Sequence, residues 1–114
     1  MPADAVKLTP AATGAVILAM DFAWAPSNDP AVLAATRALA ESIAADTPGL
    51  LWKIWTRDAA RGRAGGLYAF ADRPSALAYQ AMHTARVEAR GAADIQAALW
   101  DTNPDMGAIT RAPL

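Results

Sequence analysis

One histidine, His83, is the only side chain of this sequence whose ordinary pKa lies near neutral pH. It could take a proton from a phenolic or enolic substrate, or it could simply hydrogen-bond to its neighbours on a helix. Arg86 lies within one helical turn of it and could orient a carboxylate or anchor the helix. One histidine without spaced partners makes a poor metal site, and the absence of cysteine excludes thiolate chemistry. We therefore expect no metal.

Lys53, one of two lysines, lies between Trp52 and Ile54 in a stretch typical of a β-strand. A lysine at a covered strand position must be paired or face a cavity, because an isolated buried charge is costly. Lys53 could stabilise a substrate anion, or it could pair across a dimer with Asp21 or Asp101. The residues favour the pairing slightly.

Tryptophan and tyrosine side chains supply a set of candidate substrate-binding residues. Aromatic residues in a small domain most often belong to its core, but together with one histidine they also suit a flat, apolar ligand pocket. No glycine-rich phosphate loop, Ser-His-Asp order or dinucleotide fingerprint accompanies them. The candidates are Trp24, Trp52, Tyr68, Tyr79 and Trp100.

Residues 48–70 organise the elements that must position these side chains, and they predict a β-hairpin. Side chains alternate along residues 50–56, which predicts Leu50, Trp52 and Ile54 on one face and Leu51, Lys53 and Trp55 on the other. The partner strand spans residues 66–71, and the glycine pair before Leu67 indicates a bulge or a close backbone approach. Residues 57–63 then form an open, solvated, arginine-rich loop.

The remaining elements complete a βαββαβ order. We expect a loose leader (1–13), a strand (14–24), a helix from Pro30 to about residue 45, a second helix (72–90), a strand (93–101) and an irregular tail (102–114). The second helix should bury a stripe formed by Leu77, Ala78, Ala81, Met82 and Ala85. The order predicts an α+β, ferredoxin-like domain, with a four-stranded antiparallel sheet and both helices on one face.

The other sheet face is then bare, and Leu51, Lys53 and Trp55 are candidates for it. A hydrophobic content of 54% is high for 114 residues and favours burial of this face against a second copy, as a homodimer. The net charge of −1 predicts no nucleic-acid or membrane partner. With no signal-like leader and no long apolar run, we expect a cytoplasmic protein.

Several stretches resemble the YdhR family, which is related to the antibiotic-biosynthesis mono-oxygenases. They are PGLLWKIWT, AGGLYAF, SALAYQAMHTARVEARG and the WDTNP tail, in collinear order over roughly residues 15–114. The resemblance implies a dimeric α/β barrel. It also implies a cofactor-independent mono-oxygenase that acts on a small aromatic or quinol-type substrate in an apolar pocket, with His83 as base and Lys53 or Arg86 as anion partner. The alternative is a non-catalytic binding module for a small apolar metabolite.

Overall fold

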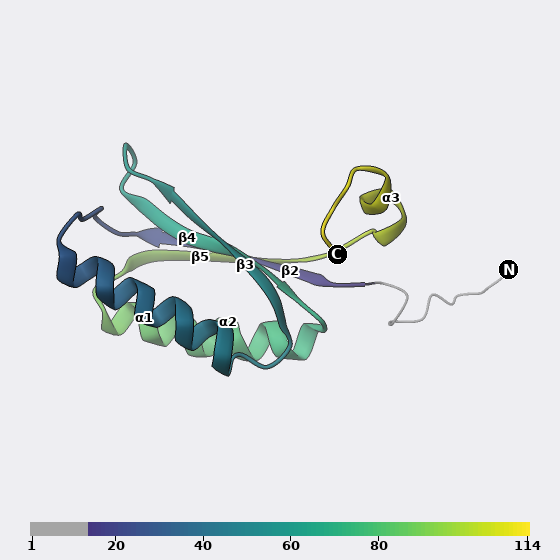
Figure 1. The fold of residues 1–114 in the computed structure, drawn as a ribbon, viewed down its shortest axis with the longest axis horizontal. Coiled ribbons are helices and arrows are strands. Elements are labelled where there is room, and N and C mark those ends of the chain that lie inside the picture. The colour runs from purple at the N-terminus through teal and green to yellow at the C-terminus, as the bar shows by residue number, and fades with distance from the viewer. Residues whose placement is uncertain (1–13) are drawn as a thin grey trace, which may run out of the picture.

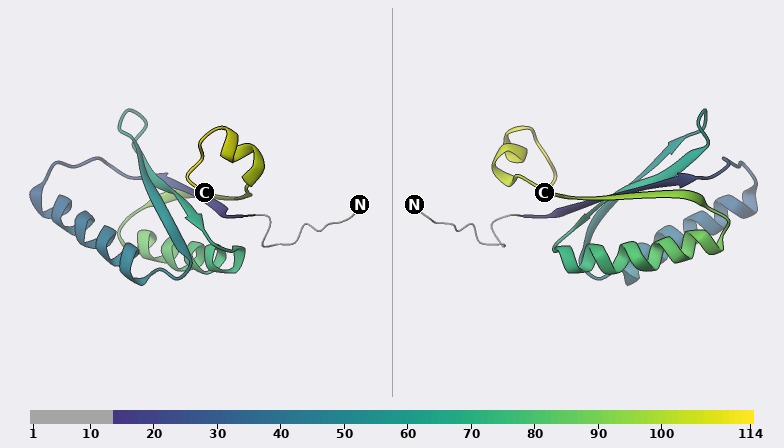
Figure 2. Two further views of the ribbon diagram at one scale, coloured as in Figure 1. Left: turned by 45° about the vertical axis from the view of Figure 1, so that its right-hand side comes forward. Right: turned by 180° about the vertical axis from the view of Figure 1, so that it is seen from behind.

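The computed structural model describes residues 14–114, in which one antiparallel sheet carries two long helices on one face and a short helix on the other (Figures 1 and 2). The predicted leader (1–13) lies outside the described residues. The elements follow in the order β2 (Val16–Ala23), α1 (Pro30–Asp46), β3 (Leu50–Asp58), β4 (Arg63–Phe70), α2 (Arg73–Ala89), β5 (Ala93–Asp101) and α3 (Pro104–Ile109).

The sheet order is β3-β4-β2-β5, and every neighbouring pair is antiparallel. The two strands that follow the helices, β3 and β5, therefore form the edges, and β2 and β4 lie between them. This arrangement confirms the predicted α+β, ferredoxin-like fold.

Both long helices begin at an aspartate followed by proline within the first turn, as the sequence indicates. The Asp29 carboxylate accepts a hydrogen bond from the Ala31 amide at 2.8 Å, and the Asp72 carboxylate accepts one from the Ser75 amide at 2.8 Å. These side chains satisfy amides that have no partner inside the helix. Among residues 14–114, no helix has the length and the apolar run that crossing a membrane requires.

The core lies between the sheet and α2. Alternate residues of β2 face it, and Tyr68 and Phe70 of β4 lie beside them with no exposed surface. Gly65 allows β2 to approach closely, because a Cβ atom there would lie 2.0 Å from the Met20 carbonyl oxygen. The predicted close approach at the glycine pair is thus confirmed. The core cluster comprises Val16, Leu18, Met20, Tyr68, Phe70, Ala76 and Tyr79.

The prediction that Lys53 and Trp55 lie on the open face is wrong. Leu50 is paired with Phe70 and packs against the core, but Trp52 is paired with Ala69, so that β3 has one extra residue at Leu51. This β-bulge reverses the alternation from Trp52 onward. Lys53 opposite Tyr68 and Trp55 opposite Gly66 consequently share the helix-facing side.

The buried stripe of α2 also differs from the prediction. Its buried residues are Ala76, Tyr79, His83 and Val87, whereas Leu77 and Met82 are almost half exposed. The stripe that contains Tyr79 and His83 is buried in place of the aliphatic one, because Arg86 hydrogen-bonds both of these side chains. A hydropathy pattern does not show such hydrogen bonds.

The hairpin between β3 and β4 is tighter than the sequence suggests. The strands extend to Asp58 and from Arg63, which leaves only residues 59–62 for the connection. Arg63 is not a solvated loop residue, because its guanidinium binds Asp21 at 2.7 Å and Asp94 at 2.8 Å. These ion pairs join β4 to β2 and to the start of β5.

The tail is not wholly irregular, since it contains α3. Asn103 caps this helix by accepting a hydrogen bond from the Met106 amide at 3.2 Å. Beyond α3 the chain returns to the open sheet face, where the indole of Trp52 donates to the Pro113 carbonyl at 3.0 Å. Figure 1 shows α3 on the side of the sheet opposite α1 and α2.

Candidate functional site

The helix-facing side of the sheet brings together three of the predicted site residues, Lys53, His83 and Arg86. Lys53 comes from β3, while His83 and Arg86 come from the inward face of α2. Two candidate tyrosines, Tyr68 of β4 and Tyr79 of α2, complete the group. We call these five residues the cationic cluster.

Arg86 fixes the tautomer of His83. Its Nε lies 3.1 Å and its Nη2 lies 2.8 Å from Nδ1 of His83. A guanidinium has only N–H donors, so Nδ1 must be the acceptor and the ring proton of neutral His83 is on Nε2. Nη2 also donates to the Tyr79 hydroxyl at 3.2 Å. The lone pair that could accept a substrate proton is therefore already engaged.

His83 stays neutral throughout the physiological range. It is 2% exposed, and its ring stacks on Tyr79 with the two ring centroids 4.9 Å apart. Burial, together with the positive charges of Arg86, Lys53 and Arg90, lowers the pKa of His83 to about 3. Every one of these influences disfavours the imidazolium.

Lys53 lies against aromatic rings. Its Nζ is 3.3 Å from the centroid of the Trp55 ring and 4.7 Å from that of the Tyr68 ring. Such cation–π contacts favour the ammonium, but burial and the charge of Arg86 outweigh them and lower the pKa of Lys53 to about 7. Near neutral pH this lysine is thus a mixture of ammonium and free amine.

The favoured pairing of Lys53 with Asp21 or Asp101 across a dimer stays a prediction, but both aspartates already have a partner within the chain. Asp21 is bound by Arg63 at 2.7 Å, and Asp101 is bound by Arg73 at 2.9 Å. Asp21 also lies on the opposite face of the sheet from Lys53, as the cross-strand pairings show. Among the described residues no carboxylate forms an ion pair with Lys53.

Both tyrosine hydroxyls of the cluster remain protonated. Burial raises the pKa of Tyr68, and its charge and hydrogen-bond interactions with Tyr79 raise it further. Burial likewise raises the pKa of Tyr79, although Tyr68 and Arg86 partly offset this effect. The two phenols therefore act as neutral hydrogen-bonding groups.

The structure does not bring the predicted tryptophans to the cluster. Trp52 and Trp100 lie on the open face, with Trp100 62% exposed and paired with Ile17. Trp24 follows the end of β2 and meets Phe22 edge to face, with ring centroids 6.1 Å apart. Trp55 and Arg90, which were not among the predicted site residues, do belong to this side. The spacing of four residues from Arg86 could have indicated that Arg90 lies on the same side of the helix. The face of Trp55 could not be predicted, because the bulge in β3 reverses the alternation.

Two open hollows flank the cluster. One, of about 430 Å³, lies between the end of α1 and the start of α2, and Tyr79 and Met82 are among its lining residues. The other, of about 640 Å³, lies between α1 and Trp55, with Arg37 and Glu41 in its lining. Ile43 is the one buried residue of α1, so this helix covers the sheet lightly.

No metal centre is evident within residues 14–114, where no three His, Asp or Glu side chains gather closely enough to hold an ion. The group that this part of the chain does assemble is cationic and aromatic. It suits an electron-rich aromatic molecule or its anion better than a metal.

Comparison with protein-family models gives one finding. Residues 17–113 match the model of the family described as "Putative mono-oxygenase ydhR". No curated protein matches the sequence.

Proposed function

This chain belongs to the YdhR family of mono-oxygenases, and on that premise we propose that it oxygenates a small aromatic, quinol-type substrate without a bound cofactor. The observation that carries the proposal is the cationic cluster, in which a lysine with a pKa of about 7 lies among tyrosine and tryptophan rings. We place the substrate between α2 and the sheet, beside Lys53.

The reaction needs no electron donor other than the substrate. A hydroquinone gives four electrons when it becomes a hydroxyquinone: one oxygen atom of O₂ becomes the new ring hydroxyl oxygen, and the other leaves as water with two of the substrate's hydrogens. An anthrone also gives four electrons when its ring CH₂ becomes a carbonyl: one oxygen atom of O₂ enters that carbonyl, and the other leaves as water with the two hydrogens of the carbon. The step that the protein must promote is loss of a proton, because the resulting anion is electron-rich enough to react with O₂ itself.

We assign the base to Lys53 rather than to His83. The free amine of Lys53 is well populated at neutral pH, whereas Nδ1 of His83 is engaged by Arg86 and its pKa is about 3. A general base works best with a pKa near the working pH. Arg86, held by His83 and Tyr79, stabilises the substrate anion by its charge. His83 is then a positioning residue for Arg86.

Oxygen uptake tests the proposal. Purified protein is incubated with a panel of hydroquinones and anthrones, and uptake is compared among wild type, Lys53→Met, His83→Gln and Arg61→Gln. Arg61 is an exposed turn residue paired with Asp58, so it serves as a control for surface charge. We expect uptake in wild type and the control and a fall of about 10²-fold or more in Lys53→Met. Equal uptake in wild type and Lys53→Met across the panel would count against it.

The same panel tests the alternative function. A non-catalytic binding module would give saturable quenching of tryptophan fluorescence with no oxygen uptake by any compound. His83→Gln would then retain the affinity of the wild type.

The partner that we propose is a second copy of this chain. Ile54, Leu67 and Trp100 are exposed on the open sheet face, where their apolar surface is in contact with water. Pairing two such faces makes a symmetric homodimer with a closed α/β barrel. The helix-facing site of each chain would remain accessible from outside the barrel.

A further inference from the structure

The cationic cluster and its neighbour Arg90 carry an excess of positive charge that nothing in the described chain neutralises. Lys53, Arg86 and Arg90 form no ion pair with any carboxylate of residues 14–114, although Arg61, Arg63 and Arg73 all do. Arg86 lies in the last turn of α2 and Arg90 is the C-cap four residues later, so their like charges repel each other. The positive charge of each arginine also lowers the pKa of His83.

The orientation of Arg86 leaves part of its guanidinium available. Its Nε and Nη2 point to His83 and Tyr79, which are both neutral acceptors. The remaining nitrogen, Nη1, has two N–H groups with no hydrogen-bond partner among the described residues. A guanidinium held in this way is already oriented to bind a planar anion.

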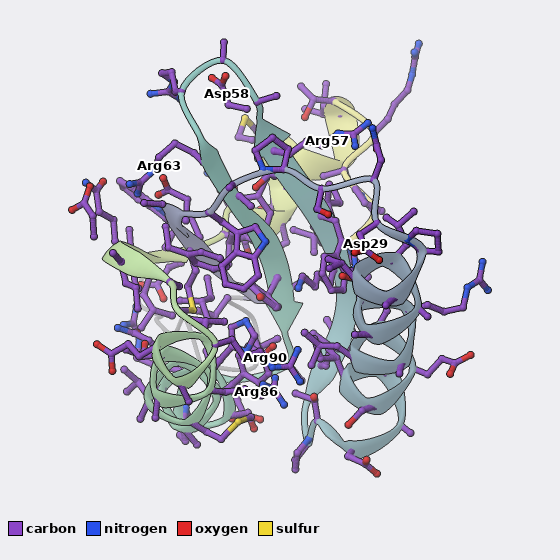
Figure 3. The ribbon with its side chains drawn as sticks, turned by 90° about the vertical axis from the view of Figure 1, so that its left-hand side faces the viewer. Asp29, Arg57, Asp58, Arg63, Arg86 and Arg90 are labelled. Atoms are coloured by element: carbon purple, nitrogen blue, oxygen red, sulfur yellow. The ribbon has the colours of Figure 1, made fainter. Side chains whose placement is uncertain are left out.

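Both arginine side chains lie on the side of α2 that faces α1. Figure 3 shows the labelled side chains of Arg86 and Arg90 between α2 and α1, with Arg57 and Asp58 near the tip of the β3–β4 hairpin. The site thus has Lys53 on its sheet side and two guanidinium groups on its α2 side.

We propose that the substrate carries a carboxylate on its aromatic ring in addition to the reacting hydroxyl, and that Arg86 and Arg90 bind this carboxylate. The inference rests on the proposed function, because it assigns the second charge of the substrate of that same site. The hydroxyl then faces Lys53 on the sheet, and the carboxylate faces Arg86 and Arg90 on the α2 side.

A matched pair of probes tests the carboxylate under nitrogen, where no turnover is needed. The probes are 2,5-dihydroxybenzoate and its neutral amide, 2,5-dihydroxybenzamide, with binding followed by tryptophan fluorescence or calorimetry. We expect the benzoate to bind roughly tenfold more tightly than the amide, as for one charge-assisted hydrogen-bonded pair. Equal affinity of wild type for the two probes would overturn the proposal.

Three variants locate the effect. Arg86→Gln and Arg90→Gln should each reduce the preference for the benzoate over the amide, and Arg90→Gln should leave the affinity for the amide within about twofold. Arg61→Gln removes the same charge at the far hairpin turn and should change nothing. Arg90 is exposed at the end of α2, so its variant remains informative even if Arg86→Gln disturbs the packing. A preference that survives in both cluster variants would also overturn the proposal.

Oxygen uptake separates this inference from the proposed function. A benzoate preference without uptake by any compound would remove the oxygenation and leave the anion site. Uptake that is equally fast with unsubstituted hydroquinone and with 2,5-dihydroxybenzoate would keep the oxygenation and remove the carboxylate.

Discussion

The two faces of one sheet differ in what their side chains can do. The helix-facing side holds Tyr68 and Lys53 among buried rings, with Arg86 and His83 of α2 above them. The open side holds Ile54, Leu67 and Trp100, which are exposed and have no charge. Because alternate residues of the same strands supply both faces, a shift of one residue in β3 would exchange their roles.

The buried core residues and the candidate catalytic residues thus lie on the same face of the sheet, while the other face provides exposed apolar surface. Within the cationic cluster Arg86 hydrogen-bonds His83 and Tyr79. Among the described residues no fully buried side-chain nitrogen or oxygen lacks a partner. The open face offers mainly surface that water covers poorly, which suits assembly. We therefore propose that the first face handles the substrate and that the second forms the dimer.

The largest effect on stability is expected from a substitution in the helix-facing core. Leu18 has no exposed surface, so Leu18→Ala should lower the free energy of unfolding by about 2–5 kcal/mol. Leu77→Ala on the outer side of α2, where the leucine is 49% exposed, is the matched control and should cost about 0.5 kcal/mol or less. Chemical denaturation measures both variants. Equal losses would mean that the core does not lie between α2 and the sheet.

The next largest effect is expected from a substitution on the open face, which should disrupt the dimer and leave the core intact. Ile54→Asp places a charge among the exposed apolar side chains and should convert a dimer into a folded monomer. Light scattering at micromolar concentration should give twice the chain mass of 11.9 kDa for wild type and Leu77→Asp, and the single mass for Ile54→Asp. A wild-type protein that is monomeric and has a native circular dichroism spectrum would contradict the proposed barrel.

A smaller effect sharpens the account of Lys53. Its pKa is lowered from 10.5 to about 7, so the folded protein disfavours the ammonium. The resulting cost in stability is fully present below about pH 7 and disappears as the pH rises toward 10.5. If Lys53→Met removes about 1 kcal/mol of this cost, Tm should rise by roughly 4–8 °C at pH 6.

The gain in Lys53→Met should shrink at pH 10. Thermal melts at the two pH values, with Arg57→Met on the same strand as control, measure the difference. A gain that is the same at both pH values would contradict a burial cost for the ammonium.

Most of the fold could be predicted from the sequence because its signals are local. Each long helix begins at an aspartate with a proline one or two residues later. These helix starts, the alternation along β2 and the break before β3 all depend on residues close together in the sequence. The bulge at Leu51 does not, because it depends on how β3 pairs with β4. That one residue moved Lys53 and Trp55 from the face predicted for them to the other.

The site was predictable in its residue types but not in its electrostatics. Tyr79, His83 and Arg86 follow a spacing of four and three residues, which puts all three on one side of a helix, and the structure brings them together. The sequence could not show that Arg86 engages Nδ1 of His83, nor that Lys53 lies beside the same group. These contacts turn the favoured base into a neutral hydrogen-bonding residue and make the lysine the titrating group.

The pH dependence of oxygen uptake tests the central claim, that Lys53 is the base of the helix-facing site. The charge that acts on Lys53 is that of Arg86, and the charge of Arg90 at the C-cap of α2 acts on the neighbouring His83. Arg37 and Glu41 of α1 line the hollow beside Trp55. With a substrate whose own hydroxyl titrates near pH 10, kcat/KM should rise through an apparent pKa of about 7 and then level off. Lys53→Met should lose that rise. A profile that is flat from pH 5 to 9, or that keeps the same inflection in Lys53→Met, would contradict the account.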